Sequence, residues 1–203
     1  MNLRRLIWPF ALSVATPLSA NPAPLDNDPP AQTVFFQRLK SLCGLAFEGK
    51  VAVDTPAEPN NPFAGKTLLM HVRECTDDGL RIPFHVGDDR SRTWVLTRTA
   101  SGLRLKHDHR HADGTADAAT LYGGDTTDAG SAQRQQFPVD AESIALFRTE
   151  GREASTRNTW ALELQPGEQF VYELSRPGGR LFRVVFDLRQ PVETPPSPWG
   201  AEH

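Results

Sequence analysis

The sequence is short of the features that would identify a function directly. Its 203 residues include only two cysteines, two methionines and two tyrosines, and its formal net charge at pH 7 is −3. The negative charge gives no overall basis for binding nucleic acid or an anionic membrane surface. A Walker loop, a Gly-x-Ser-x-Gly elbow and a His-Glu-x-x-His pattern are all missing. None of these catalytic or nucleotide-binding motifs therefore indicates that the protein is an enzyme.

Long apolar runs are also missing. The longest candidate, Leu6–Ala15, has about ten residues, well short of the ~20 that a membrane-spanning helix needs. It follows two arginines and precedes Leu18-Ser19-Ala20, and this order of segments is typical of a secretory signal peptide. We therefore expect residues 1–20 to be removed after Ala20 and the mature protein to be secreted or periplasmic, with no membrane span.

The two cysteines, Cys43 and Cys75, both lie in the expected mature part. In an oxidising compartment a single Cys43–Cys75 disulfide is the simplest interpretation, and two buried free thiols are the alternative. The disulfide would close a loop of about 32 residues and stabilise the fold by about 3–4 kcal/mol in the chain-entropy model.

The mature part divides into a leader, one domain and a tail. Residues 21–30 are rich in proline and aspartate, and we expect them to stay flexible. A helix should follow, because Val34, Phe35, Leu39 and Leu42 share one face and Gly44 is placed to end it. The single domain is expected over residues 31–190, and the Pro-rich tail 191–203 should lie extended across its surface. A second short helix is favoured within residues 137–147 by the N-cap residue Asp140.

From Leu45 the apolar period becomes alternating, which predicts strands separated by tight Gly- and Asp-containing turns. The expected strands are residues 45–53, 67–74, 80–86, 93–99, 103–111, 119–122, 159–164, 169–174 and 181–188. Their close spacing indicates antiparallel neighbours, and their number favours a closed barrel or a sandwich. We predict a mainly β fold, an antiparallel closed or nearly closed β-barrel of about nine or ten strands with one short N-terminal helix.

A short helix followed by a glycine-punctuated strand and an antiparallel meander resembles the calycin-type barrels, the lipocalins and fatty-acid-binding proteins. Gly44-Leu45-Ala46-Phe47 stands where a lipocalin carries its Gly-x-Trp, here without the tryptophan. The stretch Gly87–Trp94 is similar to segments of secreted bacterial proteins whose activity is not known. The resemblance implies a barrel that binds a small molecule.

The sharpest local pattern lies in residues 103–111. Read as a strand, this segment places Leu103, Leu105, His107, His109 and His111 on one face and the charged residues on the other. The leucines should mark the inward face, so the histidines should line the interior or mouth of the barrel. Histidines two residues apart on a strand could share one divalent transition metal ion.

A metal site would need a third ligand, and His111, His85 and His71 are the candidates. The alternative is a polar, hydrogen-bonded interior or a solvated rim without any metal. The spacing of the histidines does not decide between these interpretations.

The segment from Arg81 to Asp113 is locally basic within an acidic protein. It contains seven Lys or Arg residues against four Asp residues. Arginine is suited to hold a carboxylate or phosphate through paired hydrogen bonds. Arg92 alternates with Trp94 and Leu96, which would place it inward, but an ion pair with a neighbouring aspartate would instead fix the turn.

These patterns together predict a small-ligand-binding barrel with a polar, basic, His-containing pocket. The expected ligand is a small molecule, with an anion the best match to the arginines. The candidate binding residues are Arg92, Trp94, His107, His109, His111 and Tyr122. One alternative is a metal-dependent enzyme that uses His107 and His109. The other is a structural or interaction protein without a pocket.

Overall fold

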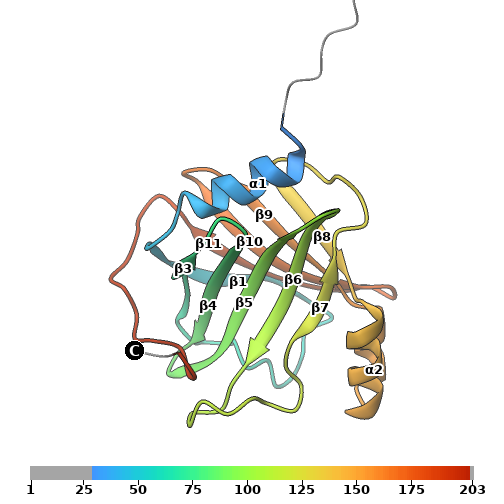
Figure 1. Ribbon diagram of the computed structural model, residues 1–203. Coiled ribbons are helices and arrows are strands. Elements are labelled where there is room, and N and C mark those ends of the chain that lie inside the picture. Colours follow the sequence, from blue (N-terminus) through green and yellow to red (C-terminus); the bar gives the residue numbers. More distant parts are fainter. Residues whose placement is uncertain (1–28, 202–203) are drawn as a thin grey trace, which may run out of the picture.

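The computed structural model describes residues 29–201 (Figure 1). The expected signal peptide, its cleavage site and most of the Pro-rich leader lie outside the described residues. In chain order the elements are α1 (Ala31–Lys40), β1 (Ala46–Thr55), β2 (Leu68–His71), β3 (Glu74–Cys75), β4 (Gly79–Val86), β5 (Asp89–Thr99), β6 (Gly102–His109), β7 (Tyr122–Asp125), β8 (Arg134–Pro138), α2 (Ala141–Thr149), the 3₁₀ helix η1 (Glu153–Arg157), β9 (Thr159–Gln165), β10 (Gln169–Arg176) and β11 (Arg180–Asp187).

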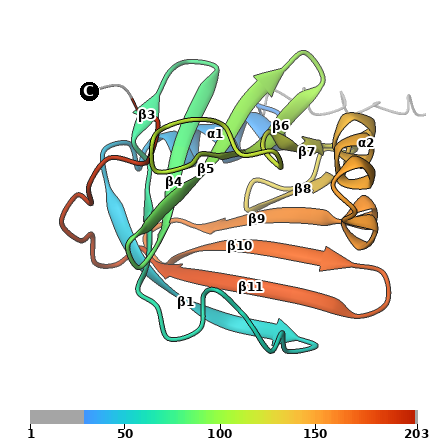
Figure 2. The ribbon, with the colours of Figure 1, turned by 90° about the horizontal axis from the view of Figure 1, so that it is seen from below.

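The strands form one antiparallel sheet that curls into a nearly closed barrel. The hydrogen-bonded order is β7-β6-β5-β4-β2-β1-β11-β10-β9-β8, and β3 pairs with β4 outside this path. Figure 2 shows this ring of strands, with α1 behind it. The prediction of a mainly β, antiparallel, nearly closed barrel with a short N-terminal helix is confirmed. The layout is compatible with a calycin-like barrel.

The barrel is closed at one end by α1, which lies across it in Figure 1. Phe35, Phe36 and Leu39 are each at most 1% exposed, so one face of the helix is buried in the barrel. The turn between β5 and β6 lies at this end, because the Arg98 guanidinium sits 5.8 Å from the centre of the Phe36 ring. The opposite ends of β5 and β6 therefore lie at the other mouth of the barrel.

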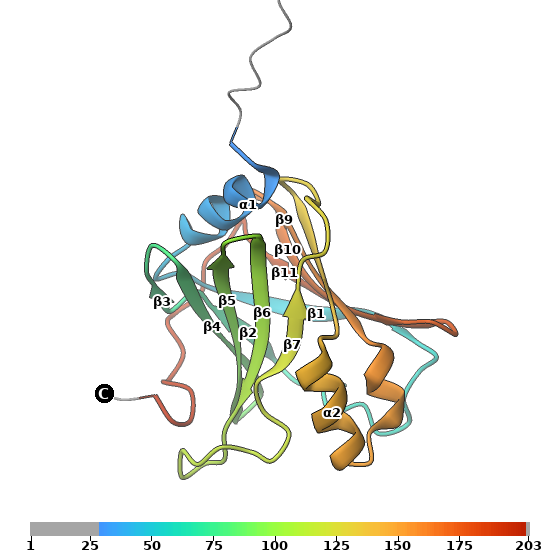
Figure 3. The same ribbon diagram turned by 45° about the vertical axis from the view of Figure 1, so that its right-hand side comes forward.

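The seam between β7 and β8 is sealed by backbone packing and by the start of α2 (Figure 3). The Gly123 carbonyl accepts a hydrogen bond from the Asp140 backbone N–H at 2.9 Å, and the Gly123 N–H donates to Ser143 Oγ at 2.8 Å. An ideal Cβ atom at Gly124 would overlap the carbonyl oxygen of Pro138. Glycine therefore lets the two edges approach closely enough to close the barrel.

The cysteines form the predicted disulfide. The Cα atoms of Cys43 and Cys75 are 6.3 Å apart, and the bond links the segment after α1 to the two-residue strand β3. Because the bond joins two residues 32 positions apart in the sequence, it restricts the unfolded chain and holds the plugging helix to the barrel wall.

Two details of the predicted secondary structure are wrong. Strand β8 was not expected, because Arg134–Pro138 has no β-branched residue and one aromatic, Phe137. Strand β7 begins at Tyr122, where the expected strand ended. It continues through Gly123 and Gly124, whose backbones pack closely against those of β6 and β8. The second helix begins at Ala141, directly after the predicted N-cap Asp140, whose side chain accepts a hydrogen bond from the Ser143 N–H, and it ends at Thr149.

The outer face of β8–β11 carries a network of charges. Arg134 and Arg183 both pair with Glu163 and Glu173, and the Glu173 side chain is 7% exposed. The pairing satisfies the carboxylates on a face that also carries Ala161, Val171 and Val185. Within residues 29–201, no helix has both the length and the apolar character required to cross a membrane.

Candidate functional site

A small cavity of about 70 Å³ lies at the mouth opposite α1. Its walls come from β4, β5, β6, β7, β10 and the loop between β1 and β2. The lining residues are Phe63, Phe84, Arg92, Thr93, Trp94, His107, His109, Tyr122 and Tyr172. Five of the six residues selected from the sequence are among them, namely Arg92, Trp94, His107, His109 and Tyr122.

Strand pairing explains why these five residues meet. In the sheet Arg92 stands opposite His109, and Trp94 stands opposite His107. His107 in turn stands opposite Tyr122 on β7. Directly opposed side chains in a sheet point to the same face. The pairs on β5, β6 and β7 therefore place all five side chains inside the barrel.

His107 is held by two hydrogen bonds in the barrel interior. Its Nδ1 lies 3.2 Å from the Tyr122 carbonyl oxygen, and its Nε2 lies 2.9 Å from the Tyr172 hydroxyl. Burial, together with the neighbouring His109, lowers the pKa of His107 to about 3, so the ring is neutral at physiological pH. A carbonyl can only accept, so Nδ1 carries the proton and Nε2 accepts from Tyr172.

His109 and Tyr122 form the outer part of the same polar row. The Tyr122 hydroxyl and His109 Nε2 are 3.0 Å apart. Burial, and then the positive charge of Arg92, lowers the pKa of His109 to about 4. Burial raises the pKa of Tyr122 to about 12. Both side chains are therefore uncharged hydrogen-bonding groups at neutral pH.

Arg92 is the one charged side chain among the nine that line the cavity. Its Nη1 donates to Asp89 Oδ2 at 2.5 Å, and its guanidinium lies 5.6 Å from the centre of the Phe63 ring. The sequence was compatible with two alternatives for Arg92, an inward position and an ion pair with a neighbouring aspartate. Both are present, because Asp89 at the strand start anchors a side chain that still reaches the cavity.

The rest of the barrel interior is filled rather than hollow. Trp94 stacks between Phe84 and Tyr172, with ring centroids 4.8 and 4.6 Å apart. Phe170 and Phe186 are fully buried beside this stack. An engineered apolar cavity that holds benzene measures about 150 Å³, so the present cavity suits a ligand of roughly half that size.

The remaining predicted histidines lie elsewhere. His111 was expected on the inward face, but β6 ends at His109 and His111 is exposed in the loop that follows. His71 and His85, considered as third metal ligands, have the opposite strand parity to the inward residues Met70 and Phe84. They are buried on the outer face, where the Arg90 and Arg73 side chains hydrogen bond to Ser197 of the C-terminal tail.

Two observations bear on the proposed metal ion. Both ring nitrogens of His107 already have hydrogen-bond partners, which leaves no lone pair directed at an ion. In the part of the chain that the structure describes, no group of three or more His, Cys, Asp and Glu side chains is arranged to hold a metal. The row of His107, His109 and Tyr122 is better described as a hydrogen-bonded polar wall.

Sequence reasoning missed Phe63, Phe84, Thr93 and Tyr172 as cavity residues. Phe63 lies in a loop without periodicity, and Phe84 and Tyr172 belong to strands whose alternation indicates only that they are inward. The one sequence signal that could have found Tyr172 is the rarity of tyrosine in this chain. The chain has two tyrosines, and both line the cavity.

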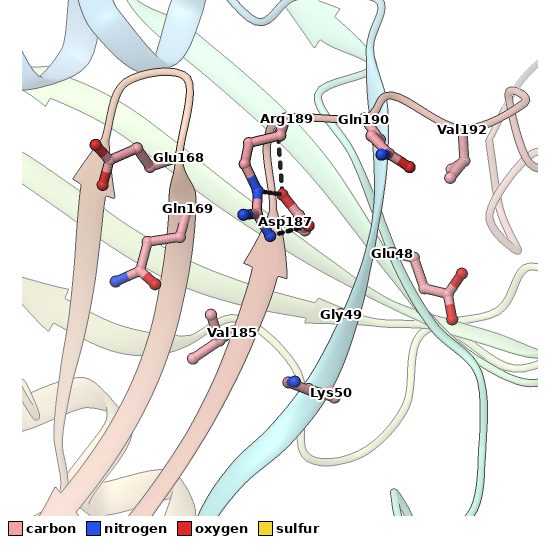
Figure 4. Close-up of a pocket in the computed structure, with 10 residues that line it drawn as sticks. All are labelled: Glu48, Gly49, Lys50, Glu168, Gln169, Val185, Asp187, Arg189, Gln190 and Val192. Atoms are coloured by element: carbon pink, nitrogen blue, oxygen red, sulfur yellow. Dashed lines mark hydrogen bonds and ion pairs between the residues drawn. The ribbon is translucent and has the colours of Figure 1, made fainter.

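Two larger hollows lie on the outer surface. The groove in Figure 4, about 480 Å³, runs over β1, β10 and β11, and its Asp187 and Arg189 hydrogen bond to each other. A second hollow, about 520 Å³, lies between the C-terminal tail and the outer face of β4–β6, where Arg81 and Arg110 both pair with Asp108. Neither hollow is walled by several aromatic side chains as the interior cavity is.

Comparison with known proteins adds no relative to this description. No family model, no curated protein and no solved structure matches the chain.

Proposed function

We propose that the protein is a secreted or periplasmic β-barrel that binds a small ligand in the cavity beneath Phe63. The observation that carries this proposal is the convergence of Arg92, His109 and Tyr122 on one aromatic-walled cavity. A few placed polar groups in a largely aromatic hollow are typical of small-molecule sites. The single charge of Arg92 favours an anionic ligand.

The lining favours binding over catalysis. The nine lining residues include no serine, cysteine or carboxylate to act as a nucleophile, and the groups that could act as general acid or base are His107 and His109. The histidines are engaged with tyrosines or a carbonyl rather than aimed at a nucleophile. The site therefore offers recognition by one cation and several neutral hydrogen-bonding groups.

Replacing Arg92 by glutamine should weaken binding of a small anion. A hydrogen bond to a charged group contributes about 1.5–3 kcal/mol, so the Kd for acetate should rise at least about tenfold. Acetate can be titrated into the protein and followed by the fluorescence of the buried tryptophans and by NMR shifts of the His109 ring.

Arg98→Gln is the matched control, because Arg98 lies on the same strand but at the α1 end of the barrel. It should bind acetate as the wild type does. Equal loss of affinity in both variants, or no saturable acetate binding by the wild type, would contradict the proposal.

Export is the second part of the proposal. The residues before Asn21 have the order of a signal peptide, and the Cys43–Cys75 disulfide supports folding in an oxidising compartment. Protein purified from the extracellular or periplasmic fraction of its native host should begin near Asn21. Intact-mass measurement checks this, and a product that retains Met1 would show that the leader is not removed.

A further inference from the structure

One side of the cavity is formed by Phe63, the one lining residue that comes from the loop between β1 and β2. The Phe63 ring lies 4.9 Å from that of Phe182 and 5.7 Å from that of Phe84, measured between centroids. The Arg92 guanidinium lies against the same ring. Phe63 therefore contacts both the aromatic wall and the one charged group of the site.

The loop itself is held at its base and is otherwise exposed. Asp54 at the end of β1 accepts hydrogen bonds from Asn61 Nδ2 at 2.7 Å and from Arg180. Asn61 Oδ1 in turn accepts from the Phe63 N–H at 2.8 Å. Within residues 56–67 only Asn61 and Phe63 are not exposed. Arg180 also holds the loop, because it donates to the Pro56 carbonyl and pairs with Glu58, and the Gly87 N–H donates to the Thr67 carbonyl at the other end. Phe63 lies between these two anchored ends of the loop.

Size and charge restrict what can lie beneath Phe63. A cavity of about 70 Å³ is roughly half of one that holds the six carbons of benzene, so it has room for about three or four heavy atoms. Arg92 uses one N–H group on Asp89, and its other guanidinium nitrogens make no hydrogen bond within residues 29–201. A planar carboxylate can accept hydrogen bonds from the free N–H groups of the Arg92 guanidinium, and the rings of Trp94 and Phe84 can pack against a short apolar end.

We propose that the ligand is the carboxylate of a short aliphatic acid and that Phe63 closes over it and limits its length. This inference rests on the proposed binding function. The acid enters when Phe63 swings away on its loop, its carboxylate pairs with Arg92, and its apolar end lies against Trp94. A longer or aromatic acid would occupy the volume of the Phe63 ring and would keep the loop from closing.

The test compares wild type with Phe63→Ala, using acetate and benzoate as probes. The wild type should prefer acetate by at least about tenfold, because a filled apolar pocket discriminates by about that factor for each added methylene-sized group. Phe63→Ala should reverse the preference, with benzoate bound at least about tenfold more tightly than by the wild type. Acetamide, which has the shape of acetate without its charge, should bind the wild type at least about tenfold more weakly than acetate.

Two further variants keep the result interpretable. Phe63→Leu retains an apolar cover and should give an intermediate preference, which serves if Phe63→Ala does not fold. Leu45→Ala truncates an exposed apolar side chain outside the cavity and should keep the wild-type preference.

The outcomes separate the two proposals. Absence of acetate binding by the wild type, or acetate binding that Arg92→Gln leaves intact, overturns the binding function itself. Acetate binding that depends on Arg92, with a preference unchanged in both Phe63 variants, overturns only the role of Phe63. Acetamide bound as tightly as acetate overturns the assignment of a carboxylate.

Discussion

Replacing Gly124 by alanine is expected to destabilise the protein by at least about 3 kcal/mol, the upper end of what overpacking usually costs. The added methyl group would collide with the carbonyl oxygen of Pro138, which is backbone and cannot move aside as a flexible side chain can. Relief requires β7 and β8 to separate, and this would also strain the hydrogen bond from the Asp140 N–H to the Gly123 carbonyl. The free energy of unfolding in urea measures the effect.

Gly79→Ala is the matched control for this experiment. Gly79 also lies in a strand, and a methyl group there would meet Thr76 Oγ1 at 3.4 Å, an ordinary contact distance. Its free energy of unfolding should change by less than about 1 kcal/mol. A Gly124→Ala variant as stable as Gly79→Ala would mean that the barrel does not close at the β7–β8 seam as described.

Mild acid should destabilise the protein well before its carboxylates are protonated. Burial is the main cause that lowers the pKa of four histidines, and the shift is large for three of them, His85 to about 4, His107 to about 3 and His109 to about 4. In the unfolded chain a histidine titrates near 6.5, so below that pH the unfolded state binds more protons than the folded state. The stabilisation is complete above about pH 6.5 and is lost as the pH falls toward about 4.

The expected loss is large. One pKa unit corresponds to about 1.4 kcal/mol, so each of these histidines contributes up to about 3 kcal/mol or somewhat more over that range. The three together are comparable to the total stability of a typical domain, about 5–15 kcal/mol. Urea unfolding at a series of pH values from 7 to 4.5 should show a steep fall in the free energy of unfolding.

His85 offers the cleanest variant for this test. Its Nε2 is buried without a hydrogen-bond partner, and after burial the charges of Arg90 and His71 lower its pKa while Asp89 raises it. In His85→Gln the unfolded and folded states should differ by about one bound proton fewer between pH 6.5 and 4. The free energy of unfolding should therefore fall less steeply with pH than in the wild type.

His111→Gln, at an exposed position, should reproduce the wild-type pH profile. A wild type that is equally stable at pH 7 and pH 4.5 would show that these histidines are not held neutral by the fold.

Much of the local structure could be predicted because it depends on nearest neighbours in the chain. The helical spacing of Phe35 and Leu39 predicted α1, and Asp140 marked the start of α2. Alternation along β6 predicted that Leu103, Leu105 and His107 share a buried face, and they do. Each of these features is a repeat or a cap, and its physical cause acts within a few residues.

The failures involve interactions between distant segments. Gly123 and Gly124 fall just beyond the predicted strand 119–122, whereas they lie in β7 at the seam, where the neighbour that excludes a side chain from Gly124 is Pro138 on another strand. The predicted strand from 103 to 111 was too long because the regular pairing with β5 ends at Arg92 and His109, and Arg110 instead forms an isolated bridge with Ala116 in the segment that follows. Sequence periodicity contains no information about where a partner strand ends.

The candidate site shows the same division. The sequence alone determined an inward row containing Trp94, His107 and His109, since side-chain direction in a strand alternates by covalent geometry, and it left the direction of Arg92 open. Only the tertiary structure decided that Phe63 covers this row and that Phe84 and Tyr172 reduce the space beneath it to about 70 Å³. The volume of a cavity is what remains after side chains from many strands have packed against one another, and no single segment of the chain specifies that remainder.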